Sequence, residues 1–183
     1  MSSARDATAA LVGRLADALL ARNATMAAAE SCTGGLVAAA CTARAGSSAW
    51  FERGVVTYSN AAKVELLGVA DAVIAAHGAV SAEVARAMAD GVIARTPATF
   101  AVAVTGIAGP GGGTAEKPVG TVWIGVSTAR TTRAEKRFNP VDRETFKYVV
   151  SQQALDLLRR ELTNEERPAL DIPPANAANL PPA

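Results

Sequence analysis

The stretch FAVAVTGIAGPGGG, residues 100–113, decides the fold class of this chain. It opens on a continuously apolar run, Phe100–Val104, which is typical of a central strand buried on both faces of a sheet. A glycine-rich loop, Thr105–Gly113, follows at once. Open α/β sheets bind ligands at such strand ends, so the sequence predicts a binding loop here, and a flexible connection is the alternative interpretation.

The segments outward from this strand alternate between strand and helix patterns. Leucines at positions 11, 15 and 19 predict an amphipathic first helix. Further strands are expected at 25–29, 53–58, 121–127 and 133–138, and further helices at about 35–43, 63–67, 71–77, 82–96 and 142–162. This alternation predicts an α/β fold, a three-layer α/β/α sandwich with a mixed sheet, over residues 1–163. The Pro- and Ala-rich segment 164–183 is expected to be a disordered tail.

Composition narrows the possible functions. The chain has 18 basic and 17 acidic side chains in 183 residues, a balance that gives no electrostatic footprint for nucleic acid or an anionic membrane. It contains no apolar run of about 18 residues that could span a bilayer, and its polar start is unlike a secretory signal. With two cysteines and one histidine, neither a disulfide framework nor a metal site is expected, and the simplest location is the cytoplasm.

The first candidate site is the stretch AESCTGG, residues 29–35, at an expected strand-to-helix junction. Unpaired N–H groups at a helix start suit an oxyanion formed when the Ser31 hydroxyl attacks a carbonyl, and Gly34 and Gly35 let a ligand approach the backbone. Alternatively, Ser31 and Thr33 are only helix caps. Cys32 is a second candidate nucleophile, although a small buried cysteine is more often inert.

The second candidate site is the stretch TYSNAAK, residues 57–63. Lys63 would lie one turn into a helix capped by Asn60, where the helix dipole and partial burial lower the pKa of its amine toward that of a base. A hydroxyl nucleophile paired with such an amine is one known catalytic arrangement. A solvated surface lysine is the alternative. Tyr58 could orient a ligand ring or relay a proton, whereas Ser59 and Asn60 are most simply capping groups.

The glycine-rich loop and the start of the last helix are two further candidate sites. The loop after residue 104 is neither a Walker A loop nor a dinucleotide fingerprint, because it does not lead into a helix with the required residues. Arg143, after Asp142 at the start of the last helix, could hold a phosphate or carboxylate, and Asp142 is the expected N-cap.

Together these motifs resemble the CinA C-terminal domain family over roughly residues 8 to 162. The resemblance is carried by AESCTGG (29–35), GSSAWFERGVVTYSNAAK (46–63), HGAVS (77–81), TGIAGP (105–110) and KPVGTV (117–122). It implies a nicotinamide-nucleotide amidase that converts nicotinamide mononucleotide to nicotinate mononucleotide and ammonia, a step of pyridine nucleotide salvage. It also implies a serine amidohydrolase with a Ser/Lys dyad and no metal.

Carried onto this sequence, the resemblance implies Ser31 as nucleophile and Lys63 as base. Tyr58, Ser48, Thr105 and Arg143 fall at positions similar to the family's pocket residues. We add Thr33, Gly34, Gly35, Ser59, Asn60, Gly106 and Gly109 to the expected substrate-binding set. The expected partner is a small nucleotide, the expected assembly a homodimer through the Ala-rich helices, and no cofactor is expected.

The sequence departs from the family pattern at two places. Val141 stands where glycine commonly precedes the Asp-Arg pair, and the Pro-rich tail has no counterpart. The N-terminal molybdopterin-like domain of longer CinA proteins has no counterpart either, so its pyrophosphatase activity is not expected. Two other functions stay open, namely a non-catalytic nucleotide- or pterin-binding module and a stress-related interaction domain.

Overall fold

A computed structural model describes residues 2–165 of the chain. The tail beyond residue 165, whose disorder remains a prediction, lies outside the described residues. Along the chain the elements are α1 (Ser2–Leu20), β1 (Met26–Glu30), α2 (Leu36–Thr42), η1 (Ser47–Ala49), β2 (Phe51–Val56), α3 (Asn60–Leu67), α4 (Asp71–His77), α5 (Ala82–Ala94), β3 (Phe100–Gly106), β4 (Thr121–Ser127), β5 (Thr132–Phe138) and α6 (Arg143–Glu165).

The sheet has five strands in the order β2-β1-β3-β4-β5. Strand β1 pairs in parallel with both β2 and β3, whereas β3 with β4 and β4 with β5 are antiparallel. The mixed sheet that the sequence predicts is therefore confirmed. From β1 the chain crosses to β2 on one side of β1, and from β2 it returns past β1 to β3 on the other side. The strand order therefore reverses between β1 and β3, and open α/β sheets bind ligands at the carboxyl ends of strands at such a point.

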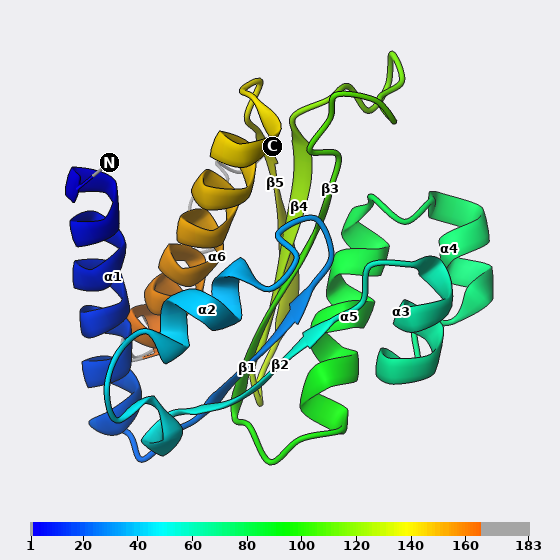
Figure 1. The fold of residues 1–183 in the computed structure, drawn as a ribbon. Helices are drawn as coiled ribbons and strands as arrows, with labels where there is room; N and C mark the ends of the chain where they lie inside the picture. The colour runs from blue at the N-terminus through cyan, green and yellow to red at the C-terminus, as the bar shows by residue number, and fades with distance from the viewer. Residues whose placement is uncertain (1, 166–183) are drawn as a thin grey trace, which may run out of the picture.

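Helices cover both faces of this sheet (Figure 1), which confirms the predicted α/β/α sandwich. Helices α1, α2 and α6 pack on one face and α5 on the other, where α3 and α4 contact α5. The loop between β3 and β4 extends beyond the end of the sheet (Figure 1). It leaves the sheet at the end where β1, β2 and β3 all terminate.

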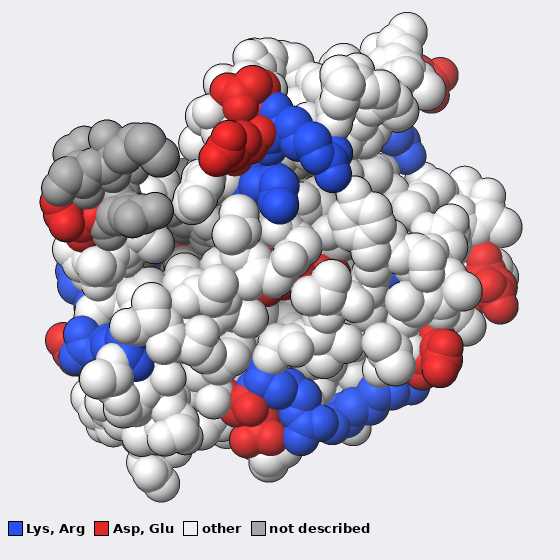
Figure 2. Space-filling model, viewed as in Figure 1, with Lys and Arg blue, Asp and Glu red and all other residues white. Residues whose placement is uncertain are grey.

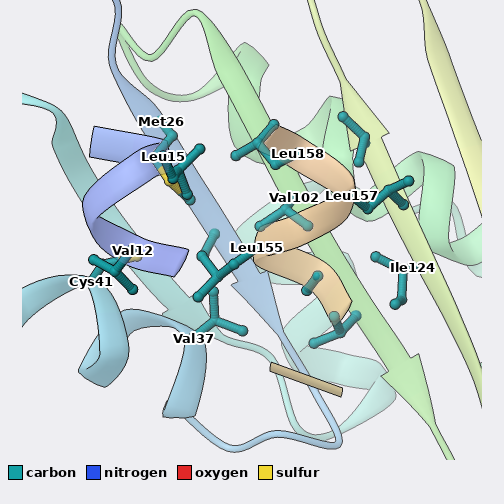
Figure 3. Packing of buried hydrophobic residues seen from close by; sticks show 14 of the residues in the cluster. Val12, Leu15, Met26, Val37, Cys41, Val102, Ile124, Leu155, Leu157 and Leu158 are labelled. Carbon is teal, nitrogen blue, oxygen red and sulfur yellow. The ribbon is translucent and has the colours of Figure 1, made fainter. Parts of the chain in front are cut away.

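The period-two alternation of β1 assigns its side chains to two cores. Met26 and Ala28 face the core beneath α1, α2 and α6, whereas Ala27 and Ala29 face α5. Figure 3 shows the first core, where Met26 lies with leucines of α1 and α6 and with valines of α2 and β3. This alternation continues past the strand end and decides which way the next residues point.

Helix starts follow the predicted capping chemistry with one correction. Ser81 caps α5 and Asp142 caps α6 by accepting from the N–H groups of Val84 and Thr145, as the sequence predicts. Helix α3, however, is capped by Ser59 and not by Asn60, because the Ser59 Oγ accepts from the Ala62 N–H at 3.0 Å. The prediction of Asn60 as the cap was therefore wrong by one residue.

The surface carries mixed charge. On the face shown in Figure 2, most groups of charged side chains contain both Lys or Arg and Asp or Glu. None of the helices within residues 2–165 combines the length and apolar character needed to cross a membrane.

Candidate active site

A cavity of about 280 Å³ opens at the carboxyl ends of β1 and β3. Its volume is near the lower end of the range that small-molecule sites occupy. Beyond the end of β1, the Ser31 N–H still donates to the Val104 carbonyl at 3.0 Å. The pairing of β1 with β3 therefore continues through Ser31 and places it at the cavity. Eight predicted site residues line the cavity: Ser31, Tyr58, Asn60, Lys63, Thr105, Gly106, Gly109 and Arg143.

Ser31 and Lys63 meet inside this cavity. The Lys63 Nζ lies 3.2 Å from the Ser31 Oγ, although the two residues are 32 positions apart in the chain. Odd-numbered residues of β1 face α5 and its neighbour α3, so Ser31 points toward α3, which carries Lys63 one turn from its cap. The arrangement joins a hydroxyl and an amine within proton-transfer distance.

The amine of Lys63 is almost fully enclosed, since the residue is 1% exposed. Its Nζ also donates to the backbone carbonyls of Thr57 at 3.0 Å and of Tyr58 at 3.4 Å. Burial lowers the pKa of Lys63 below the usual value for a lysine, because removing the amine from water disfavours its charged form. A buried lysine of this kind spends more of its time as a neutral base than a surface lysine does.

The Cys32 thiol also lines the cavity but lacks the features of a nucleophile. Cys32 is 5% exposed, and burial raises the pKa of its thiol to about 12. The thiol therefore stays protonated near neutral pH, whereas the reactive form of a cysteine is the thiolate. Of the two side chains, Ser31 is the one that has an amine within hydrogen-bonding distance.

Arg143 connects two walls of the cavity. Its Nη1 donates to the Gly109 carbonyl at 2.8 Å, and its Nη2 donates to the Tyr58 hydroxyl at 2.9 Å. A guanidinium has five N–H donors, so donors remain for an anionic ligand. Tyr58 is 60% exposed, which places its ring at the mouth of the cavity and not in its depth.

Thr105 and the glycine loop form the wall opposite Ser31. The Thr105 Oγ1 donates to the Ala79 carbonyl at 2.7 Å, which ties the end of β3 to the segment between α4 and α5. Ala79, Val80 and the loop from Gly106 to Gly112 continue this wall. The predicted binding loop therefore borders the cavity that holds Ser31 and Lys63.

The architecture and the sequence both have known counterparts. A profile of the CinA C-terminal domain matches residues 8–162. This chain belongs to the CinA C-terminal domain family. Among solved structures, a CinA relative from Klebsiella pneumoniae described as competence damage-inducible protein A has a TM-score of 0.82 and 38% identity, over 85% of this chain and 97% of that one. A relative from Agrobacterium tumefaciens has a TM-score of 0.80 and 42% identity, over 85% and 95% of the two chains.

Curated CinA relatives carry two kinds of name. The nicotinamide-nucleotide amidohydrolase PncC of Enterobacter agglomerans is 53% identical over 73% of this chain and 82% of its own length. The PncC of Escherichia coli K12 is 56% identical over 64% of this chain and 71% of its own. A CinA-like protein of Gemmatimonas aurantiaca is 49% identical over 79% of this chain, which spans only about a third of that relative, 34%.

Five predicted residues do not line the cavity. Thr33 is buried and donates to the Glu30 carboxylate, and Ser59 serves as the α3 cap. Gly34 and Gly35 form the turn behind Ser31, where their positive φ angles of 63° and 102° favour glycine. Ser48 lies in η1, ahead of β2, and so at the opposite end of the sheet.

Two residues near the cavity, Glu30 and Lys147, were not among the predicted site residues. Glu30 is fully buried, and its carboxylate accepts four hydrogen bonds from the turn and the start of α2. Lys147 lies one helical turn after Arg143, and a Cβ built on Gly34 would be 3.8 Å from its Nζ. Spacing from Arg143 could have indicated Lys147, since residues four apart share a helix face, but its contact with the nucleophile turn needs the fold.

Metal ligands are not gathered at this site. Within residues 2–165, the structure brings together no group of three or more His, Cys, Asp or Glu side chains that could hold a metal ion. The polar side chains that line the cavity carry hydroxyls, one thiol, one carboxamide, one amine and one guanidinium.

Proposed function

We propose that this CinA-family chain hydrolyses the carboxamide of nicotinamide mononucleotide, releasing nicotinate mononucleotide and ammonia. The observation that carries the proposal is the 3.2 Å separation between the Ser31 Oγ and the buried Lys63 Nζ within a cavity. The PncC names of relatives that align over most of their own length support the choice of substrate.

The reaction follows from the roles of the two side chains. Neutral Lys63 takes the hydroxyl proton as the Ser31 oxygen attacks the carboxamide carbon, and backbone N–H groups stabilise the resulting oxyanion. Lys63 then gives that proton to the leaving nitrogen, so the C–N bond breaks and ammonia departs. Water, deprotonated by Lys63, attacks the acyl ester and releases the acid and the Ser31 hydroxyl.

The direct test is ammonia release by the purified chain. We expect turnover of nicotinamide mononucleotide well above that of nicotinamide, glutamine and asparagine, and we expect the rate to persist with a chelator. Tight binding of the nucleotide without ammonia release would instead identify a non-catalytic binding module and would contradict the proposal.

The nucleotide phosphate is assigned to Arg143 and Lys147, which lie four residues apart on α6 and so on one face of that helix. Neither side chain forms an ion pair with a carboxylate of residues 6–163, whose side chains the structure describes. Lys147 lies over Gly34, beside the Ser31 turn, and Arg143 lies at the cavity wall. Two cations on one helix face beside the Ser31 turn complement a phosphate dianion.

Lys147→Met should therefore raise the KM for nicotinamide mononucleotide about tenfold, in the range of a charge-assisted hydrogen bond that is partly exposed, with little change in kcat. The KM for nicotinamide riboside, which lacks the phosphate, should stay constant. Lys136→Met on β5 is a matched control for charge loss. Equal effects on both substrates would show that Lys147 does not recognise the phosphate.

A further inference from the structure

We propose that Glu30 is a positioning residue of this active site, whose carboxylate holds the turn 31–35 so that the N–H group of Cys32 is left for the oxyanion. This inference rests on the proposed amidase function. The Glu30 side chain is fully buried and is not part of the cavity lining, so it acts through the turn that carries Ser31.

The carboxylate is saturated by donors of that turn and of α2. Its Oε2 accepts from the Thr33 hydroxyl at 2.6 Å, the Gly35 N–H at 2.9 Å and the Val37 N–H at 3.1 Å. Its Oε1 accepts from the Ala38 N–H at 2.8 Å. All four partners donate, so both carboxylate oxygens act only as acceptors here.

Strand alternation places the side chains of Glu30 and Ser31 on opposite faces of the sheet. Even-numbered side chains of β1 face the core beneath α2, and odd-numbered ones face the opposite layer. Glu30 therefore lies under the start of α2 while Ser31 points toward Lys63. Because Glu30 and Ser31 are adjacent, the hydrogen bonds that hold the Glu30 side chain also restrict the backbone of Ser31.

Three of the five N–H groups in the turn 31–35 already donate to protein oxygens. Ser31 N–H donates to Val104 and Gly34 N–H donates to the Ser31 carbonyl. Gly35 N–H is taken by Glu30, so the N–H groups of both glycines in the turn are already used. Within the described part of the chain, no protein oxygen accepts from the N–H groups of Cys32 or Thr33.

Of these two groups, only the Cys32 N–H belongs to a residue that lines the cavity, because Thr33 is fully buried outside the lining. Donors beside a nucleophile stabilise a transition-state oxyanion only if they are held in place before the reaction. The four bonds to Glu30 supply that restraint at a turn with two consecutive glycines, which would otherwise sample many conformations.

Glu30→Gln tests this role because it keeps size and shape but replaces one acceptor by a donor. Whichever way the amide turns, its nitrogen meets the Ala38 N–H or the three donors around Oε2. We expect kcat for nicotinamide mononucleotide to fall about 10²-fold, the range for a lost oxyanion donor, with KM nearly constant.

A second readout does not depend on the substrate assignment. A fluorophosphonate probe forms a bond between the Ser31 oxygen and phosphorus, fluoride leaves, and the hydroxyl proton passes to Lys63. The labelling rate of Ser31, followed by mass spectrometry, should fall in Glu30→Gln by about the same 10²-fold as kcat, because the phosphoryl oxygen uses the same donor. Thr33→Val, which removes only one donor to Glu30, is the milder variant if Glu30→Gln folds poorly, and it should give a smaller loss.

The control is Leu15→Ala in the core beneath α1, far from the cavity. It should lower the Tm while labelling of Ser31 stays at the wild-type rate. Wild-type labelling rates in both Glu30→Gln and Thr33→Val would overturn the positioning role. A protein that labels at Ser31 but releases no ammonia would refute the substrate and leave Glu30 testable by labelling, whereas no labelling of the wild-type chain would overturn both proposals.

Discussion

Replacing Ser31 by alanine is expected to reduce ammonia release from nicotinamide mononucleotide by a factor on the order of 10⁴ or more, because a covalent mechanism loses its only nucleophile. The substitution removes one oxygen from a side chain that is 8% exposed, so the fold should be unchanged. Single-turnover assays would measure the loss of chemistry, and binding of nicotinate mononucleotide would show that the cavity remains intact.

Ser47→Ala is the matched serine control, since Ser47 lies in η1 at the other end of the sheet and should keep wild-type turnover. Iodoacetamide near neutral pH should also leave the wild-type protein active, because burial raises the pKa of the Cys32 thiol to about 12 and keeps it protonated. Substantial turnover by Ser31→Ala, or rapid inactivation by iodoacetamide, would point to another nucleophile.

Much of the framework could be predicted from local patterns. The apolar run 100–104 predicted the central strand β3, and the leucines of the first helix predicted α1. Gly68 and Gly78 directly follow α3 and α4, because glycine permits positive φ angles regardless of tertiary contacts. These signals are local, so the sequence carries them without the fold.

The missing parts of the site depend on contacts between distant segments. Arg143 reaches Tyr58 across 85 positions, and the order of the strands decides that they meet. Glu30 escaped attention because a glutamate at a strand end is usually exposed, and only the packing of α2 over β1 encloses it. Ser48 shows the opposite case, because its family resemblance is clear while this fold places it away from the cavity.

Lys63→Met is expected to lower kcat by about 10²- to 10⁴-fold, the usual contribution of a general base, with a smaller effect on KM. Lys63→Arg separates the base from a structural lysine. A guanidinium can still donate to the carbonyls of Thr57 and Tyr58, but it stays protonated and cannot accept the Ser31 proton. Both variants should therefore lose ammonia release to a similar extent, whereas a structural lysine would be rescued by arginine.

The pH dependence of kcat/KM is a second test of Lys63 as the base. Lys63 acts as a base only when neutral, so kcat/KM of the wild-type chain should rise with pH as this amine loses its proton. Because burial lowers the pKa of Lys63, the midpoint of that rise should fall below 10.5, the ordinary value for a lysine. The residual activity of Lys63→Met should lack this limb. A limb that persists in the variant would assign the base to another group, and the 3.2 Å contact with Ser31 would then be a packing contact and not a catalytic one.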